Sequence, residues 1–174
     1  MDIEWDKALF SSERFEYHPP SLSCDHIFHV MFNNKEAVLP QLPFFYGMSE
    51  EAHTERREKQ KSGILEGTSC YLDVIDKHTA TVVGGAGFTE IEGTKAEWGI
   101  IVEPSWRKKG VASEAFFSNV IFAKEKLKCT HILAATLPIN DVMLAFLHKR
   151  GMRELKRVDG DEWIRFEAEI EDLL

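Results

Sequence analysis

The sequence has little cysteine, and none of it stands in an arrangement that binds metals. Cys24, Cys70 and Cys129 are odd in number and widely spaced, with neither a CxxC pair nor a His/Cys cluster at zinc spacing. This pattern excludes a disulfide-rich scaffold and a structural zinc site, and we expect no metal. Three reduced, mostly buried thiols are typical of a cytoplasmic protein.

Long apolar runs are also missing. No segment approaches the roughly 18–20 apolar residues that a membrane-spanning helix needs. The first residues, Met1 to Lys7, are acidic and lack the apolar centre of a signal peptide. We therefore expect no membrane partner and a cytoplasmic location.

Positive charge is in deficit. The chain has 21 Lys and Arg against 29 Asp and Glu, which gives a formal net charge of −8. A general nucleic-acid binder usually carries the opposite sign, so we expect no nucleic-acid partner. An acidic surface suits a cationic substrate, although it more often serves only solubility. The expected assembly is a monomer or a homodimer.

The 174 residues contain no repeat, no low-complexity segment and no long linker, which predicts a single domain over residues 1–174. A short strand at residues 14–17 and a helix at 23–32 come first. A proline-containing loop at residues 39–48 and a helix capped by Ser49 follow. Apolar runs separated by turn residues then predict an antiparallel meander of three strands, at residues 70–75, 81–88 and 95–102.

The second half predicts a crossover. An amphipathic helix at residues 111–127 joins the strand that ends at Val102 to a strand at 131–137, so these two strands should be parallel. Asn140 can cap a last helix, and Asp159-Gly160 predicts a tight hairpin between strands at 153–158 and 162–170. The fold class is therefore α+β (mixed α/β), with a mostly antiparallel seven-stranded sheet, a central parallel pair and about four flanking helices.

A basic turn lies between the end of the third meander strand and the long helix. It reads Arg107-Lys108-Lys109-Gly110, and Glu114 in the first helical turn suits the helix dipole. Such a turn presents unpaired backbone N–H groups and the positive end of a dipole to one point, where a phosphate is the natural occupant. The alternative is an exposed basic turn that binds nothing.

Arg107 to Ala112 matches the Arg/Gln-x-x-Gly-x-Gly/Ala signature of the GNAT N-acetyltransferase superfamily, and the chain resembles that family in context too. Asn140 stands at a strand-to-helix junction, and Arg150-Gly151-Met152 occupies the place of a closing Leu-Gly-Phe-like motif. Ala96 to Gly99 and Ser113 to Ala115 look most like the branch that acetylates ribosomal-protein N-termini. That branch also contains small-molecule acetyltransferases.

The resemblance implies that acetyl-coenzyme A lies between two splayed parallel strands. The strand backbone at Ile100, Ile101 and Val102 would bind the pantetheine arm, and Asn140 would flank the thiol end. The turn and the first helical residues would hold the pyrophosphate through their amides: Arg107, Lys108, Lys109, Gly110, Val111, Ala112 and Ser113.

Acetyl transfer to an amine requires a neutral amine, a polarised carbonyl and a departing thiolate. A strand amide near Ile101 or Val102 could stabilise the oxyanion. Glu97 is the candidate base, since it shares a strand face with Ile101; the alternative is a solvated or salt-bridged glutamate. Many family members carry a tyrosine acid, but the family spacing lands on Leu147, which leaves Ser113 or a water as the proton donor.

The acceptor is the least defined part. Phe44, Phe45 and Tyr46 could line an acceptor site together with Glu97, or could simply belong to the core. The predicted function is transfer of an acetyl group from acetyl-coenzyme A to a primary amine, by direct attack in a ternary complex. The acceptor would be a protein N-terminus or a small amine. The alternative is a catalytically silent regulatory module that binds an acyl-coenzyme A.

Overall fold

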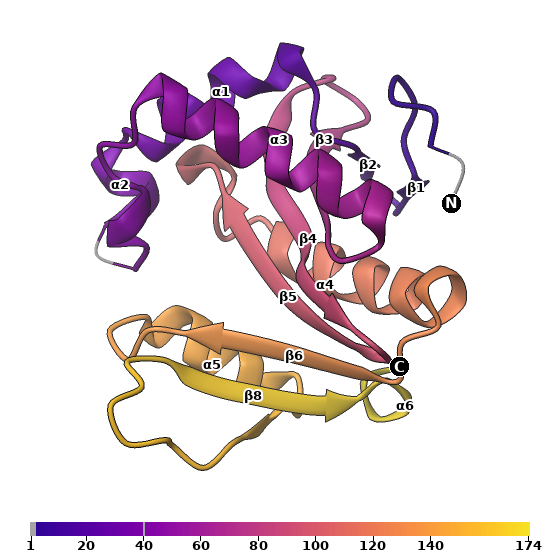
Figure 1. Ribbon diagram of the computed structural model, residues 1–174, viewed down its shortest axis with the longest axis vertical. Coiled ribbons are helices and arrows are strands. Elements are labelled where there is room, and N and C mark those ends of the chain that lie inside the picture. The colour runs from indigo at the N-terminus through magenta and orange to yellow at the C-terminus, as the bar shows by residue number, and fades with distance from the viewer. Residues whose placement is uncertain (1–2, 40) are drawn as a thin grey trace.

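The computed structural model describes residues 3–39 and 41–174, and its main feature is one open sheet with helices on both faces (Figure 1). The strands are β1 (Phe10–Ser11), β2 (Phe15–His18), β3 (Cys70–Asp76), β4 (Val82–Glu92), β5 (Lys95–Val102), β6 (His131–Thr136), β7 (Arg153–Glu154) and β8 (Ile164–Glu169). The α-helices are α1 (Leu22–Phe32), α2 (Lys35–Val38), α3 (Glu50–Glu66), α4 (Val111–Phe122), α5 (Asp141–Lys149) and α6 (Ile170–Leu173).

The strand order is β1-β2-β3-β4-β5-β6-β8-β7, and every neighbouring pair is antiparallel except β5 and β6. The mixed sheet, the meander and the parallel pair are thus confirmed. The eighth strand arises because Phe10 pairs opposite Tyr17 and adds a short edge strand. The helices exceed the expected four because α2 and α6 are short segments of four residues each.

The parallel pair is splayed. β5 and β6 pair at only three positions, from Lys95 opposite His131 to Glu97 opposite Leu133. Beyond Glu97, β5 continues along β4 and β6 continues along β8, so the two strands diverge (Figure 1). The β6-facing backbone edge of Ile100 to Val102 therefore has no strand partner among the described residues.

The two faces of β5 pack against different helices. Trp98 faces α4 and α5, with its ring centroid 5.0 Å from that of Phe116 and 5.8 Å from that of Phe146. Ile101 belongs instead to a second apolar cluster with Phe28 of α1. Glu97 follows the alternation of Ile101, as the sequence predicts, and the structure adds that α1 and α3 lie on this face.

The predicted hairpin is confirmed in part: β7 and β8 pair antiparallel, but the connection at Asp159-Gly160 is not a tight turn between them. Residues 159–160 do form a turn, but the strand before it is only Arg153–Glu154, and residues 155–163 form a loop. Asp161 accounts for the difference, because its carboxylate accepts hydrogen bonds from the Trp163 N–H at 3.0 Å and from Arg165 Nε at 2.8 Å. These local bonds stabilise the loop conformation at the residues just before β8.

Two other expectations concern the chain as a whole. Cys24, Cys70 and Cys129 are free and buried. No helix in the described part of the chain combines the length and the apolar character needed to cross a membrane. Of the predicted loop at 39–48, residue 40 lies outside the described residues.

Candidate active site

The basic turn presents a row of free backbone donors. Gly110 is the N-cap of α4 with φ = 80°, a left-handed conformation that glycine adopts without strain, and Lys108 has φ = 59°. Within the described structure, no hydrogen bond uses the N–H of any residue from Lys108 through Ser113; the first bond of α4 runs from the Glu114 N–H to Gly110 O. These N–H groups, at the positive end of α4, form the geometry of an anion site.

The Arg107 side chain is engaged elsewhere. Its Nη1 donates to Glu36 O at 2.7 Å and its Nη2 to Ala37 O at 2.6 Å, which ties the turn to α2. Its Nε lies 3.3 Å from Val102 O. Lys108 and Lys109 are exposed beside the free amides. Arg14 also lies there, since its Nη1 donates to Lys109 O at 2.9 Å.

Glu114 fixes the same helix end to the edge of the sheet. Its carboxylate accepts hydrogen bonds from Ser12 Oγ at 2.6 Å, from the Arg14 N–H at 2.7 Å and from Arg14 Nε at 2.7 Å. Burial acts to raise the pKa of Glu114, but the hydrogen bonds from Ser12 and Arg14 outweigh it and the pKa is lowered. Glu114 therefore has a structural role at this helix end.

Ser113 lies against Arg150. Its Oγ accepts a hydrogen bond from Arg150 Nη2 at 2.5 Å, and the guanidinium lies over the rings of Phe117 and Phe146. Burial lowers the pKa of Arg150, and its Nε is buried with no partner among the described atoms. Ser113 thus lies on the α4 face of the sheet, opposite the face that carries Glu97, so the two candidate catalytic residues are not brought together.

Asn140 and Leu147 belong to α5 and its cap, which follow β6. Asn140 is the N-cap, as predicted, and its Oδ1 accepts from the Met143 N–H at 3.2 Å. Its side-chain amide nitrogen donates to no atom of the described residues, so it remains free at the β6 side of the splay. Leu147 is fully buried in the main core, which explains why this position offers no proton donor to the splay.

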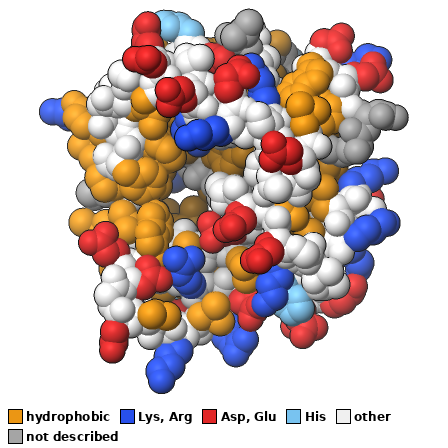
Figure 2. Space-filling view, in the orientation of Figure 1, with side chains coloured by type: hydrophobic (Ala, Val, Ile, Leu, Met, Phe, Trp, Pro, Cys, Tyr) orange, Lys and Arg blue, Asp and Glu red, His pale blue; other side chains and the backbone are white. Residues whose placement is uncertain are grey.

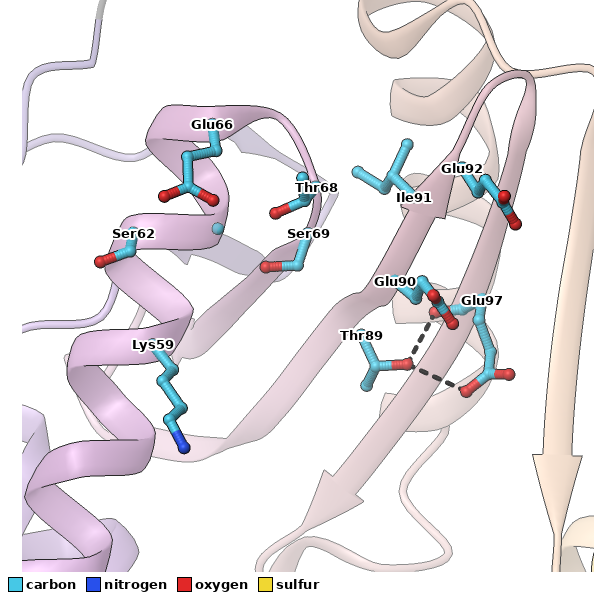
Figure 3. Close-up of a pocket in the computed structure, with 11 residues that line it drawn as sticks. Lys59, Ser62, Glu66, Thr68, Ser69, Thr89, Glu90, Ile91, Glu92 and Glu97 are labelled. Carbon is cyan, nitrogen blue, oxygen red and sulfur yellow. Dashed lines mark hydrogen bonds between the residues drawn. The ribbon is translucent and has the colours of Figure 1, made fainter.

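Glu97 sits where the strands part. Thr89 is the extra residue of a β-bulge in β4, and its Oγ1 contacts both Glu97 O at 3.2 Å and Glu97 Oε1 at 3.1 Å (Figure 3). On the other side, Arg165 Nη1 of β8 lies 3.8 Å from Glu97 Oε2. The side chain keeps 28% exposure, so a hydrogen bond and an ion pair orient a carboxylate that solvent still reaches.

Glu97 also borders a pocket of about 770 Å³ between α3 and the β4–β5 pair. Lys59, Ser62 and Glu66 line it from α3, and Thr89 and Glu90 line it from the bulge (Figure 3). The predicted alternatives for Glu97 are therefore both partly present: the residue has a salt-bridge partner and it faces a cavity.

The three aromatic side chains at residues 44–46 do not line one surface together. Phe45 turns inward and stacks on Phe32 with a centroid distance of 4.5 Å, while Tyr46 is exposed beside Lys35. Phe44 is half-exposed and reaches Trp163 of the loop before β8, at 5.7 Å. The sequence did not single out Trp163, because nothing local shows that its loop meets residue 44.

Figure 2 shows a hollow between the part of the molecule formed by the N-terminal helices and the part formed by β6 and β8, with hydrophobic side chains on both rims. It opens where β5 and β6 diverge in Figure 1. Within residues 3–39 and 41–174, no group of three or more His, Cys, Asp or Glu side chains could hold a metal ion. The described residues therefore provide a row of free N–H donors at the start of α4, a strand edge without a partner at Ile100 to Val102, and the Glu97 carboxylate where β5 and β6 part.

Solved structures share this architecture. A GNAT-family acetyltransferase from Bacillus anthracis superposes with a TM-score of 0.76 at 20% identity, covering 92% of this chain and 98% of that one. RimL, a ribosomal L7/L12 alpha-N-protein acetyltransferase in complex with coenzyme A, gives a TM-score of 0.80 at 14% identity, with 95% and 99% covered. A mutant of SpeG, a spermidine N-acetyltransferase from Vibrio cholerae, gives 0.71 at 16% identity, with 92% and 96% covered.

No curated protein sequence matches the chain. The family model described as "Acetyltransferase (GNAT) domain" matches residues 14–153, which include the meander, the basic turn and α5. The solved structures are too distant in sequence to show more than the fold, but the family model covers most of the chain. The chain belongs to the GNAT acetyltransferase family.

Proposed function

We propose that the protein transfers an acetyl group from acetyl-coenzyme A to a primary amine. The observation that carries this proposal is the pairing of a free row of N–H donors at α4 with the splay of β5 from β6, in a chain of the GNAT family. A pyrophosphate needs several convergent donors, and an extended pantetheine amide chain needs a free strand edge. The free N–H donors lie at the basic turn, and the free strand edge lies between that turn and Glu97 in the sequence.

The donor half of the site follows from these groups. The amides of Lys108 through Ser113 bind the pyrophosphate, and Lys108 and Lys109 add positive charge. The family resemblance implies that Arg107 contributes its amide, but its N–H donates to Pro104 O at 3.2 Å, so its part is to hold α2 against the turn through its side chain. The outer edge of Ile100 to Val102 binds the pantetheine arm, and Asn140 flanks the thiol end.

The acceptor half is organised around Glu97. This carboxylate removes a proton from the ammonium through a bound water, and the neutral amine attacks the thioester carbonyl. A strand amide near Ile101 or Val102 stabilises the oxyanion. The attack gives a tetrahedral adduct, and its collapse breaks the C–S bond. The second proton on the nitrogen passes through a water to the departing thiolate, which leaves the neutral amide and the free thiol of coenzyme A. We favour water over Ser113, because the Ser113 hydroxyl is bound to Arg150 on the other face of the sheet.

The fold leaves the acceptor open, since RimL is named for a protein N-terminus and SpeG for spermidine. A carboxylate acting through water suits an amine of pKa near about 8 better than a lysine side chain of about 10.4. We place the reaction in the cytoplasm, where three buried free thiols would remain reduced.

The test is thiol release from acetyl-coenzyme A with a panel of amines, alongside a calorimetric titration with coenzyme A. Saturable turnover with at least one primary amine is the expected result. The second candidate, a silent module, is favoured by the buried Leu147 at the position of the usual acid. Tight coenzyme A binding without turnover on any amine would support that candidate and refute the enzyme.

A further inference from the structure

Arg56 of α3 lies in an aromatic cage on the face of the sheet that carries Glu97. Its guanidinium carbon is 4.9 Å from the ring centroid of Phe32, 4.8 Å from that of Phe45 and 5.8 Å from that of Tyr71. These rings come from α1, from the segment before α3 and from β3. Cation–π contacts with three rings hold the planar group in one place.

The N–H donors of the Arg56 guanidinium have no hydrogen-bond partner among the described residues. Across residues 3–39 and 41–174, no hydrogen bond or ion pair involves the Arg56 side chain, and none of its nitrogens is among the buried atoms that lack a partner. They therefore remain accessible. Burial lowers the pKa of Arg56, yet an arginine keeps its charge at neutral pH.

The adjacent acids cannot serve Arg56 because Arg57 engages them. Arg57 Nη1 and Nη2 bind the two oxygens of Asp73 at 2.7 and 2.8 Å, and its Nε binds Asp25 Oδ1 at 2.6 Å. This buried network fastens α3 to β3 and α1. It leaves Arg56 as a partly buried cation whose accessible N–H donors are free to bind an anion that enters from solvent.

Arg56 and Glu97 border the same strip of β5. A Cβ placed on Gly99 would lie 3.8 Å from Tyr71 Cε2 and 3.3 Å from Thr89 Cγ2, so a ring of the Arg56 cage and the bulge residue that contacts Glu97 both approach Gly99. Gly99 and Glu97 are two residues apart on one strand face, about 6.8 Å. Lys59, one turn beyond Arg56 on α3, lines the pocket that Glu97 borders.

We propose that the acceptor is a small amine that also carries an anionic group, a carboxylate or a phosphate. Its amine lies at Glu97 and its anion binds the Arg56 fork, which suits two oxygens of one group. The strip between the two groups, from Glu97 to the Gly99 that Tyr71 of the cage approaches, is short and suits a small molecule. The inference rests on the proposed function for the reaction but on Arg56 alone for the choice of acceptor.

The test compares matched acceptors on the full chain. The probes all carry an α-amine of pKa about 8, so that they differ in the anion and not in the amine. They are glycylglycine, its methyl ester, glycylaminomethylphosphonate as a phosphate mimic, and a tetrapeptide with uncharged side chains and an amidated C-terminus. Turnover is measured as kcat/KM, and binding is measured by calorimetry on the coenzyme A complex, which needs no reaction. The variants are Arg56→Gln, Arg56→Lys and the control Lys61→Gln, which removes one charge from α3 at a residue paired with Glu58.

The wild type should favour each anionic probe over the methyl ester by at least about tenfold, as expected for charge-assisted hydrogen bonds. Arg56→Gln should abolish this preference through KM, Arg56→Lys should keep part of it, and Lys61→Gln should leave it unchanged. Thermal melts confirm that each variant is folded.

The turnover measurement and the binding measurement separate the enzyme proposal from the anion-site proposal. Anion preference in binding without any turnover would sink the enzyme proposal and leave the anion site standing. Turnover with the ester or the tetrapeptide equal to or above that with the anionic probes would overturn the anion site and leave the enzyme proposal intact. A preference that survives Arg56→Gln would also overturn the assignment to Arg56.

Discussion

Replacing Glu97 by glutamine tests the base most sharply. Glutamine keeps an oxygen to accept from Thr89, and the lost ion pair with Arg165 is long and partly exposed, so its stability cost is about 0–1 kcal/mol. The fold should therefore survive. Any loss of rate then reports on proton removal rather than on the structure of the splay.

The size of the effect follows from the amine. An α-amine of pKa about 8 is only about one-tenth neutral at pH 7 and about nine-tenths neutral at pH 9. General bases contribute typically about 10²–10⁴-fold when they act directly, and less through a water. We expect Glu97→Gln to lower kcat about ten- to a hundredfold at pH 7, and by less than about tenfold at pH 9.

The assay is a pH profile of kcat for the wild type, Glu97→Gln and the control Glu154→Gln, whose residue lies in the edge strand β7. The control should follow the wild type throughout. Equal activity of Glu97→Gln and wild type at pH 7, in a folded protein, would remove Glu97 from the mechanism. A loss that stays constant from pH 7 to pH 9 would assign Glu97 to binding instead of proton transfer.

Two further predictions concern stability. Asp73→Asn removes one side of the buried fork to Arg57 but leaves the Asp25 contact, so the free energy of unfolding in urea should fall by about 3 kcal/mol, and a loss below about 1 kcal/mol would contradict a structural role for this pair. The lowered pKa of Glu114 means that its contribution is present above the ordinary glutamate pKa of about 4.3 and is lost as the pH falls through the folded value. The stability gap between wild type and Glu114→Gln should therefore be full at pH 6 and shrink towards pH 3 in acid-dependent melts; a gap that does not depend on pH would refute this reasoning.

Features with short-range causes could be predicted from the sequence. Ser49 caps α3 by accepting from the Ala52 N–H, and Asn140 caps α5 in the same way. The alternation of β5 correctly sends Trp98 to one face and Glu97 to the other. Gly110 starts α4 because it tolerates a left-handed conformation at the turn. Each of these depends on residues within a few positions of one another.

Features built from distant segments could not be predicted. The Arg56 cage needs α1, the segment before α3 and β3 at one point, and no local pattern distinguishes Arg56 from its neighbours on a charged helix. Arg107 is a second example, because its side chain binds carbonyl groups of α2, some seventy residues earlier in the chain, rather than remaining free at the basic turn. The hairpin of β7 and β8 has a longer connection than the sequence predicts, because Asp161 offers the backbone competing bonds.

The central claim is that the free amides at the start of α4 and the splayed edge of β5 together bind an acyl-coenzyme A. The most direct measurement is a two-dimensional amide NMR titration of the isotope-labelled protein with coenzyme A. We predict that the largest shifts fall on Lys108 through Ser113 and on Ile100 to Val102, with smaller shifts at Asn140. Shifts confined to the pocket beside α3, or no saturable shift at all, would contradict the account.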